Sequence, residues 1–165
     1  MWLREDLRLD DHPALTAAIE RGAPLHLVYV LDDDSPEVRP LGGAARWWLH
    51  HSLEALDAAL REQGGRLHLR RGPAEDVIPA IVADAVHWTR RYGAAREVDA
   101  RIKSALRAAG LEATSFPGTA MHEPWTVTTG QGGPYRVFTP FWRACLQRDV
   151  APPLPPSPLG DATWA

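Results

Sequence analysis

Short apolar segments alternate with amphipathic segments along the first 116 residues of the chain, and this order constrains the fold more than any other feature. A strand, a crossover helix and a second strand in one sheet form a right-handed unit with parallel strands. The sequence therefore predicts an α/β fold with a doubly wound, five-stranded parallel sheet of the Rossmann-like class. The expected strands are Met1–Leu3, Leu25–Val30, Leu67–Leu69, Ala85–Trp88 and Glu112–Phe116.

The segments between these strands are expected to be helices, because their apolar residues recur every three or four positions and so share one face. The first helix should begin near Pro13, with Asp11 or His12 as its cap. A short helix is expected over Asp76–Val82, with Pro79 near its first turn. A long helix that ends at Gly64–Gly65 should face the sheet with Leu49, Leu53, Leu56 and Leu60. A later helix that ends at Gly110 should face it with Val98, Ile102, Leu106 and Ala109.

The pattern changes after residue 120. Trp125–Thr129 and Tyr135–Thr139 flank the glycine-rich segment Gly130–Pro134, which predicts a loose hairpin. A short helix is expected over Phe141–Gln147, and the prolines of Ala151–Pro158 are typical of an extended interdomain linker. We therefore expect an α/β domain in residues 1–120, a hairpin and helix leading out of it in 121–150, and a linker in 151–165.

Composition excludes several classes of protein. No apolar run approaches the roughly 18 residues of a membrane span, and charged residues begin at Arg4, where a signal peptide needs an apolar core, so we expect a cytoplasmic protein. A net charge of −3 argues against a stand-alone nucleic-acid binder. One cysteine, Cys145, cannot form an internal disulfide.

Candidate binding residues follow the first and fourth strands, whose carboxyl ends border the crevice in which doubly wound sheets bind ligands. The arginines here either hold an anionic ligand or join the loop to carboxylates and to a neighbouring domain. The segment after the fourth strand either closes the same crevice or is a solvated charged loop. The candidates are Arg4, Asp6, Arg8, Thr89, Arg91 and Tyr92.

Two further candidates stand at the start of the long helix after Gly42–Gly43. Free backbone amides at that helix end, together with Arg46, could accept an anion, and Trp47 or Trp48 offers a flat face for a planar heterocycle. The alternative is an ordinary helix start in which the tryptophans cover apolar surface.

No catalytic or metal-ligating residue is predicted. The chain contains no G-x-G-x-x-G after its first strand, no G-x-x-x-x-G-K-S/T, no H-E-x-x-H and no nucleophile elbow. Asp32–Asp34 reads as a solvated turn, because successive carboxylates do not spread enough ligands around a cation. His50 and His51 are successive in a helix and so point about 100° apart.

Four ordered motifs resemble those of the DNA photolyase and cryptochrome family. They are W-L-R-E-D-L-R-L-D-D at residues 2–11, V-H-W-T-R-R-Y at 86–92, H-E-P at 122–124 and Y-R-V-F-T-P-F-W at 135–142. The resemblance implies the amino-terminal α/β domain of a deoxyribodipyrimidine photolyase, which repairs DNA with light, or of a cryptochrome. In that family a helical domain follows, which binds FAD and damaged DNA. This domain is absent from the sequence, so the chain alone is not expected to be catalytic.

The resemblance also implies an antenna role, in which a methenyltetrahydrofolate, deazaflavin or flavin chromophore passes excitation to FAD in the missing domain. Arg4, Asp6, Arg8 and Asp11 match the opening motif, and Arg46 matches an arginine that contacts the antenna in some members. The segment Thr89–Ala95 departs from the family pattern and lacks its acidic and amide ligands. The antenna's type and presence therefore stay open. The alternatives are a free-standing nucleotide-binding or signalling module of the same fold, or a small enzyme using the crevice.

Overall fold

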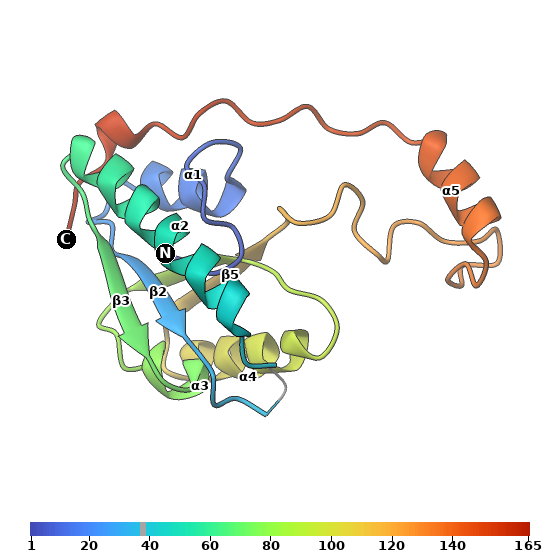
Figure 1. Cartoon of the computed structure of the whole chain (residues 1–165). Coiled ribbons are helices and arrows are strands. Elements are labelled where there is room, and N and C mark those ends of the chain that lie inside the picture. Colours follow the sequence, from blue (N-terminus) through green and yellow to red (C-terminus); the bar gives the residue numbers. More distant parts are fainter. Residues whose placement is uncertain (37–38) are drawn as a thin grey trace.

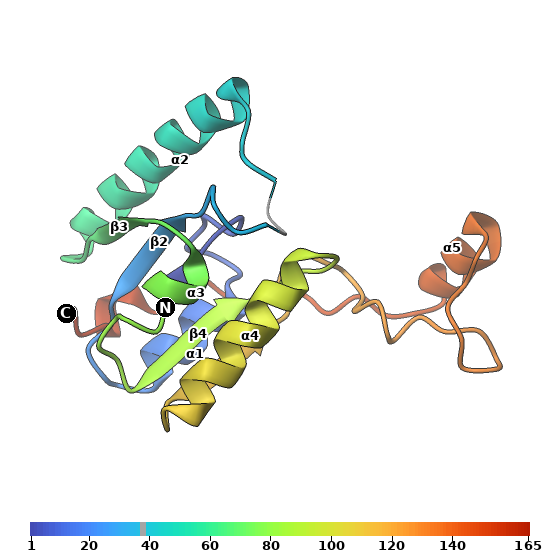
Figure 2. The same ribbon diagram turned by 90° about the horizontal axis from the view of Figure 1, so that it is seen from below.

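A computed structural model, which describes residues 1–36 and 39–165, places a five-stranded sheet between two layers of helices (Figure 1, Figure 2). Every strand pair is parallel and the strand order is β3-β2-β1-β4-β5, so the doubly wound class is confirmed. The order reverses between β1 and β4, which makes their carboxyl ends the topological switch point. The strands are β1 Trp2–Leu3, β2 Leu27–Leu31, β3 Leu67–Arg71, β4 Ala85–Thr89 and β5 Glu112–Phe116.

The helices follow the expected order along the chain. They are α1 Pro13–Glu20, α2 Gly43–Glu62, α3 Ala74–Val77, α4 Ala95–Ala108 and α5 Phe138–Leu146, with a 3₁₀ turn η1 at Leu159–Asp161. His12 caps α1, because its Nδ1 accepts a hydrogen bond from the Leu15 amide at 3.3 Å. In the described part of the chain, no helix is long and apolar enough to cross a membrane.

The core consists of two clusters, one on each face of the sheet, because successive residues of a strand point to opposite faces. Trp2 and Trp88 pack with residues of α3 and α4, including Ile102. Leu3 and Leu27 pack on the other face with residues of α1 and α2. The right-handed crossovers therefore place α1 and α2 on one side and α3 and α4 on the other.

Helix α2 covers the sheet only with its carboxyl-terminal half. Leu56 and Leu60 are buried, whereas Leu49 and Leu53 are only half-buried. The amino-terminal half extends beyond the sheet (Figure 2). The expected four-leucine face thus packs at two of its four positions.

Helix α3 is shorter than the expected helix over Asp76–Val82 and begins and ends earlier. It ends at Val77, two residues before Pro79, because proline has no amide to donate to a carbonyl of the preceding turn. Its start is set by Asp32, whose Oδ2 accepts a hydrogen bond from the Ala74 amide at 3.0 Å.

The predicted hairpin is reduced to a turn. Its only ladder contact is an isolated antiparallel bridge between Thr128 and Pro134, within the described residues. The expected second strand instead enters α5, which begins at Phe138 rather than Phe141. Pro140 is tolerated because the first turn of a helix has no use for its amides. A lone two-stranded ribbon has no sheet face to bury and is marginal by itself.

In the segment 151–165, residues 151–158 run from the protruding α5 back to the α/β body, where η1 and the last residues of the chain follow (Figure 1). The Leu154 amide donates to Asp11, and Ser157 contacts the hydroxyl of Thr16. At its end Trp164 forms a parallel bridge with Leu25 and packs against the cluster on the α1 and α2 face. Its role as an interdomain linker stays a prediction.

The docking of Trp164 yields a test. A Cβ at Gly65 would lie 2.6 Å from the Trp164 ring, so Gly65→Ala must displace the indole or the tail. We expect Gly65→Ala to lower the free energy of unfolding by about 1–3 kcal/mol, the usual cost of overpacking, in urea titrations followed by circular dichroism.

The control is Gly43→Ala, because a Cβ there meets nothing within 4 Å. In a Trp164→Ala background the cost of Gly65→Ala should vanish. Equal effects of Gly65→Ala in both backgrounds would contradict the docked position of Trp164.

Candidate functional site

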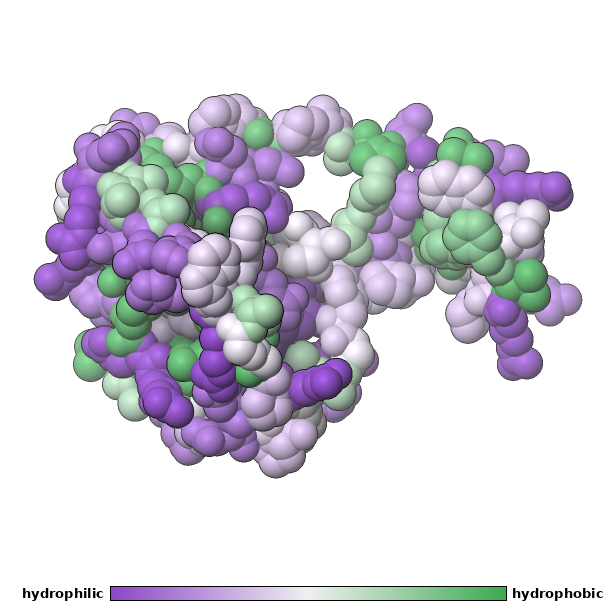
Figure 3. Space-filling model, viewed as in Figure 1, coloured by the Kyte–Doolittle hydropathy of each residue, from purple (hydrophilic) through white to green (hydrophobic). Residues whose placement is uncertain are grey.

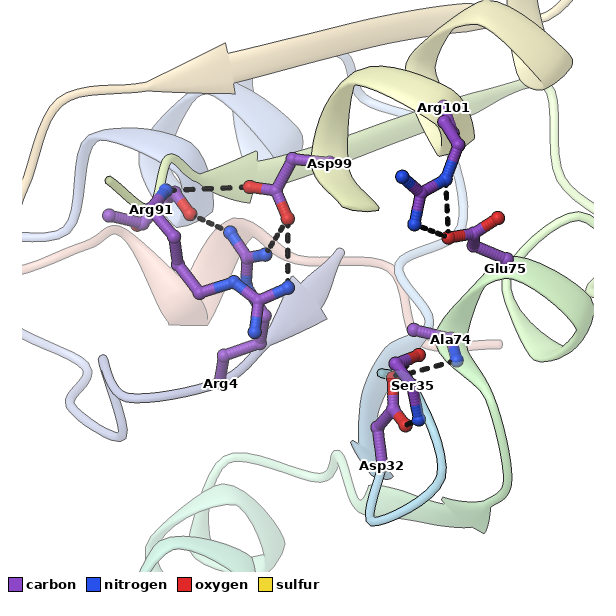
Figure 4. Close-up of polar contacts among 9 residues, drawn as sticks. Arg4, Asp32, Ser35, Ala74, Glu75, Arg91, Asp99 and Arg101 are labelled. Atoms are coloured by element: carbon purple, nitrogen blue, oxygen red, sulfur yellow. Dashed lines mark hydrogen bonds and ion pairs between the residues drawn. The ribbon is translucent and has the colours of Figure 1, made fainter. Parts of the chain in front are cut away.

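Asp99 joins two arginines at the switch point. Arg4 follows β1 directly, and its Nη1 donates to Asp99 Oδ1 at 2.5 Å, while its Nη2 donates to the carbonyl oxygen of Thr89. Arg91 donates to the same Oδ1 at 2.9 Å (Figure 4). Arg4 and Asp99 are buried, and the Arg4 guanidinium also lies 4.3 Å from the centre of the Trp2 ring.

Burial lowers the pKa of Arg4, and the neighbouring Asp99 counteracts this by favouring the charged guanidinium. An arginine stays charged in proteins, so the buried charge depends on its carboxylate partner. The Arg4 guanidinium therefore binds groups of the chain itself, Asp99 and the Thr89 carbonyl, and is not free to face the crevice.

Asp6 and His12 form a second buried contact beside the first. The Arg4 amide donates to Asp6 Oδ1 at 2.8 Å, and His12 Nε2 lies 3.1 Å from Asp6 Oδ2 in poor hydrogen-bond alignment. Burial raises the pKa of the Asp6 carboxyl, but contacts with His12, Thr89 and the Arg4 amide outweigh it and lower the pKa to about 2. Asp6 is therefore an ionised structural group rather than a proton donor near neutral pH.

Arg8 serves the backbone of two loops. Its Nη2 donates to the carbonyl oxygens of Asp11 at 2.8 Å and Gly118 at 3.1 Å. Gly118 lies close to Thr89, since a Cβ at Gly118 would be 3.0 Å from the Thr89 methyl group. Arg8 thus ties the loop after β1 to the loop after β5.

Little space remains at the switch point itself. The gap bordered by Arg4, Asp6, Thr89 and Arg91 has a volume of about 10 Å³, which is room for about one water molecule. The fold therefore brings these four predicted residues together, but they contact one another and other groups of the chain and leave no space for a ligand.

Arg46 and Trp47 lie elsewhere, at the amino-terminal end of α2. Arg46 donates to the Leu41 carbonyl at 3.0 Å and to Asp33 at 2.8 Å. Asp33 is ion-paired and Asp32 caps α3, so the expected solvated turn is wrong for these two carboxylates. Trp47 is 63% exposed.

Tyr92 points to a wider cleft on the α4 side of the rim. Its hydroxyl donates to Glu123 at 2.8 Å, and Arg90 binds the other oxygen of the same carboxylate at 3.0 Å. Trp125 stands beside both, with its ring centre 6.4 Å from that of Tyr92. The cleft has a volume of about 400 Å³ and is also lined by Lys103.

The cleft is cationic and partly unsatisfied. Lys103, which donates to Ser115, has no carboxylate partner among the described residues, and burial lowers its pKa. Trp88 lines the cleft, is fully buried, and its indole nitrogen has no hydrogen-bond partner in the described part of the chain. The arrangement can accept a planar ligand that carries acceptors or negative charge.

Sequence reasoning missed Asp99 and used Glu123 only as part of a motif. A possible signal for Asp99 was its place beside Val98 on the apolar face of α4, where a carboxylate needs a buried partner. No local signal links Glu123 to Tyr92 and Arg90, because the partners lie 31 and 33 residues apart.

The comparisons with known proteins agree with one another. The family model described as DNA photolyase matches residues 1–158. A deoxyribodipyrimidine photo-lyase from Agrobacterium fabrum is 48% identical over 166 residues, which cover 96% of this chain and 34% of that protein. Cryptochrome-1 from Arabidopsis thaliana is 34% identical, over 94% of this chain and 24% of that protein.

A solved structure gives the same result. A bacterial class III photolyase from Agrobacterium tumefaciens superposes with a TM-score of 0.89 and 45% identity, over 99% of this chain and 34% of that one. The chain thus spans about a third or less of the length of the relatives named here.

The lowered pKa of Asp6 predicts a pH dependence of stability. A carboxyl whose pKa is lowered on folding contributes stability above its unfolded pKa of about 3.9 and loses it as pH falls through the folded value. With a folded pKa of about 2, we expect Asp6→Asn to cost about 2 kcal/mol at pH 7 and progressively less below pH 4. Urea unfolding from pH 7 to pH 3 measures this, with Asp10→Asn as the exposed control. A cost independent of pH would contradict it.

The pairing of Asp99 with two arginines predicts a large effect of its removal. Asp99→Asn leaves the Arg4 guanidinium buried without a counter-charge, and we expect a loss of about 3 kcal/mol or more in the free energy of unfolding. Glu75→Gln, which removes the more exposed ion pair with Arg101 seen in Figure 4, should cost less than about 1 kcal/mol. Similar losses in the two variants would refute the structural role given to Asp99.

Proposed function

The chain belongs to the DNA photolyase family, and we propose that it is the amino-terminal α/β domain of a deoxyribodipyrimidine photolyase or cryptochrome that supports a separate FAD domain. The observation that carries the proposal is the coverage, since almost the whole chain corresponds to only about a third of a photolyase. Light-driven repair needs a base extruded from the helix and a redox cofactor, so it is assigned to the remaining part.

The surface of the α5 arm supports a partner beyond the α/β body. Phe138 and Trp142 stack with ring centres 6.3 Å apart and are 70% and 49% exposed, and Leu146 is 66% exposed. Apolar residues gather on this arm (Figure 3). Contiguous exposed apolar surface marks an interaction site, and we assign it to the FAD domain of the same protein. Damaged DNA is contacted through that domain only, and the protein acts in the cytoplasm.

We further propose that an antenna chromophore of the methenyltetrahydrofolate, deazaflavin or flavin type binds in the cleft beside Tyr92 and Trp125. Support comes from the volume of about 400 Å³, which falls in the range of small-molecule sites, and from the cationic lining. Excitation would pass from this chromophore to FAD. The gap around Arg4 at the switch point is too small for a chromophore, which favours the cleft as the binding site.

A chimeric enzyme tests the domain role. Replacing the corresponding third of the Agrobacterium fabrum photolyase by this chain should leave FAD bound and light-dependent removal of pyrimidine dimers measurable. Phe138→Asp with Trp142→Asp should lower the FAD content of the chimera, whereas Val82→Asp, at a 99% exposed site on the body, should not.

The isolated chain should unfold at the same urea concentration with and without these changes. A chimera that loses FAD although the chain alone is folded would overturn the domain role. It would favour the alternative, a free-standing nucleotide-binding or signalling module of the same fold.

Absorbance spectroscopy tests the antenna. After incubation with each of the three chromophore types and gel filtration, we expect one type to remain bound and to absorb beyond the tryptophan band. Tyr92→Ala or Trp125→Ala should weaken its binding about tenfold through lost aromatic contact, while Tyr135→Ala should not. Retention that is unchanged in both cleft variants, or no retention of any type, would contradict binding in this cleft.

A further inference from the structure

Three side chains on the exposed side of α2 converge on one point. His50 Nε2 lies 3.3 Å from one carboxylate oxygen of Glu54, and His51 Nδ1 lies 3.0 Å from the other. One nitrogen or oxygen atom from each of the three residues lies within 4.8 Å of the other two. All three residues are exposed, so the cluster is open to solvent.

The spacing along the helix explains the convergence. Glu54 is four residues after His50 and three after His51, and both separations place side chains on neighbouring positions of a helix surface. The two imidazoles diverge at their Cα atoms, yet their ring centres are only 5.1 Å apart because both turn toward Glu54. The Trp47 and His51 rings lie edge to face with their centres 4.5 Å apart.

Two imidazole nitrogens and one carboxylate oxygen form the donor set of borderline divalent transition-metal ions. Ca²⁺ and Mg²⁺ prefer oxygen ligands throughout and fit it poorly. We propose that His50, His51 and Glu54 form a surface site for such an ion, with Zn²⁺ and Ni²⁺ as representatives. Three protein ligands leave a position open for water.

Little rearrangement separates the present cluster from a loaded site. Ligand atoms at about 2.1 Å from a tetrahedral ion are about 3.4 Å apart, and the two imidazoles already lie at 3.3 and 3.0 Å from the two different oxygens of Glu54. In the loaded site His50 binds through Nε2 and His51 through Nδ1, so the proton that each of these nitrogens directs at Glu54 moves to the other ring nitrogen or is released. Arg46, one turn earlier, is directed to Leu41 and Asp33 by its own hydrogen bonds.

Calorimetric titration of the chain, produced without a polyhistidine tag, tests the site with Zn²⁺. We expect one ion per chain from the cluster. Glu54→Gln and His50→Asn should each weaken binding about tenfold or more, since even outer partners of metal ligands contribute on that scale. The matched controls are Glu62→Gln, on the same helix, and His122→Asn, outside it, and both should bind as the unaltered chain does.

Fluorescence gives an independent readout, because Ni²⁺ bound to His51 would lie beside the Trp47 ring and quench it. In Glu54→Gln the quenching should require about tenfold higher Ni²⁺ concentrations or more, whereas Glu62→Gln should leave the titration unchanged. Zn²⁺ affinity equal in Glu54→Gln and the unaltered chain would overturn the proposal, as would an absence of binding at millimolar Zn²⁺. The site and its test do not depend on the proposed photolyase role.

Discussion

The carboxyl edge of the sheet depends on one buried carboxylate, that of Asp99. It holds Arg4 from the end of β1 and Arg91 from the loop after β4, and so connects three elements with charge-assisted hydrogen bonds. Desolvating such charges is costly, and their mutual attraction returns that cost only when the geometry is good. The network therefore specifies how α4 sits on the sheet, and it occupies the position at which other doubly wound folds bind ligands.

This use of the switch point moves the available binding surfaces outward. The cleft beside Tyr92 and Trp125 lies on the α4 side of the rim, and the apolar residues of α5 lie on an arm that protrudes from the body. The free half of α2 presents a third surface. These three surfaces lie apart from one another, and they are the ones to which we assign the proposed chromophore, partner domain and metal ion.

The accuracy of the sequence-based predictions follows the range of the interactions involved. The range of β5 agrees residue for residue, because Gly110 and Pro117 bound the strand, although only Ala113 of its residues is buried. Both ends of α3 were misplaced. Pro79 ended the helix early, and Asp32, which lies 42 residues before Ala74 in the chain, set its start. The hairpin was overestimated, because a local turn signal does not reveal whether a sheet is present to pair with.

What the sequence determined by itself is the alternation of strands and helices, the parallel sheet and the family, since periodicity and motif order are properties of neighbouring residues. Only the tertiary structure decided that Arg4 pairs with Asp99, 95 residues later, and that Trp164 returns to Leu25. The candidate residues were recognised by type, but whether a charged group faces a ligand or another side chain depends on which elements the fold brings together. Burial makes that choice, because a charge removed from water must find its partner wherever the packed chain places one.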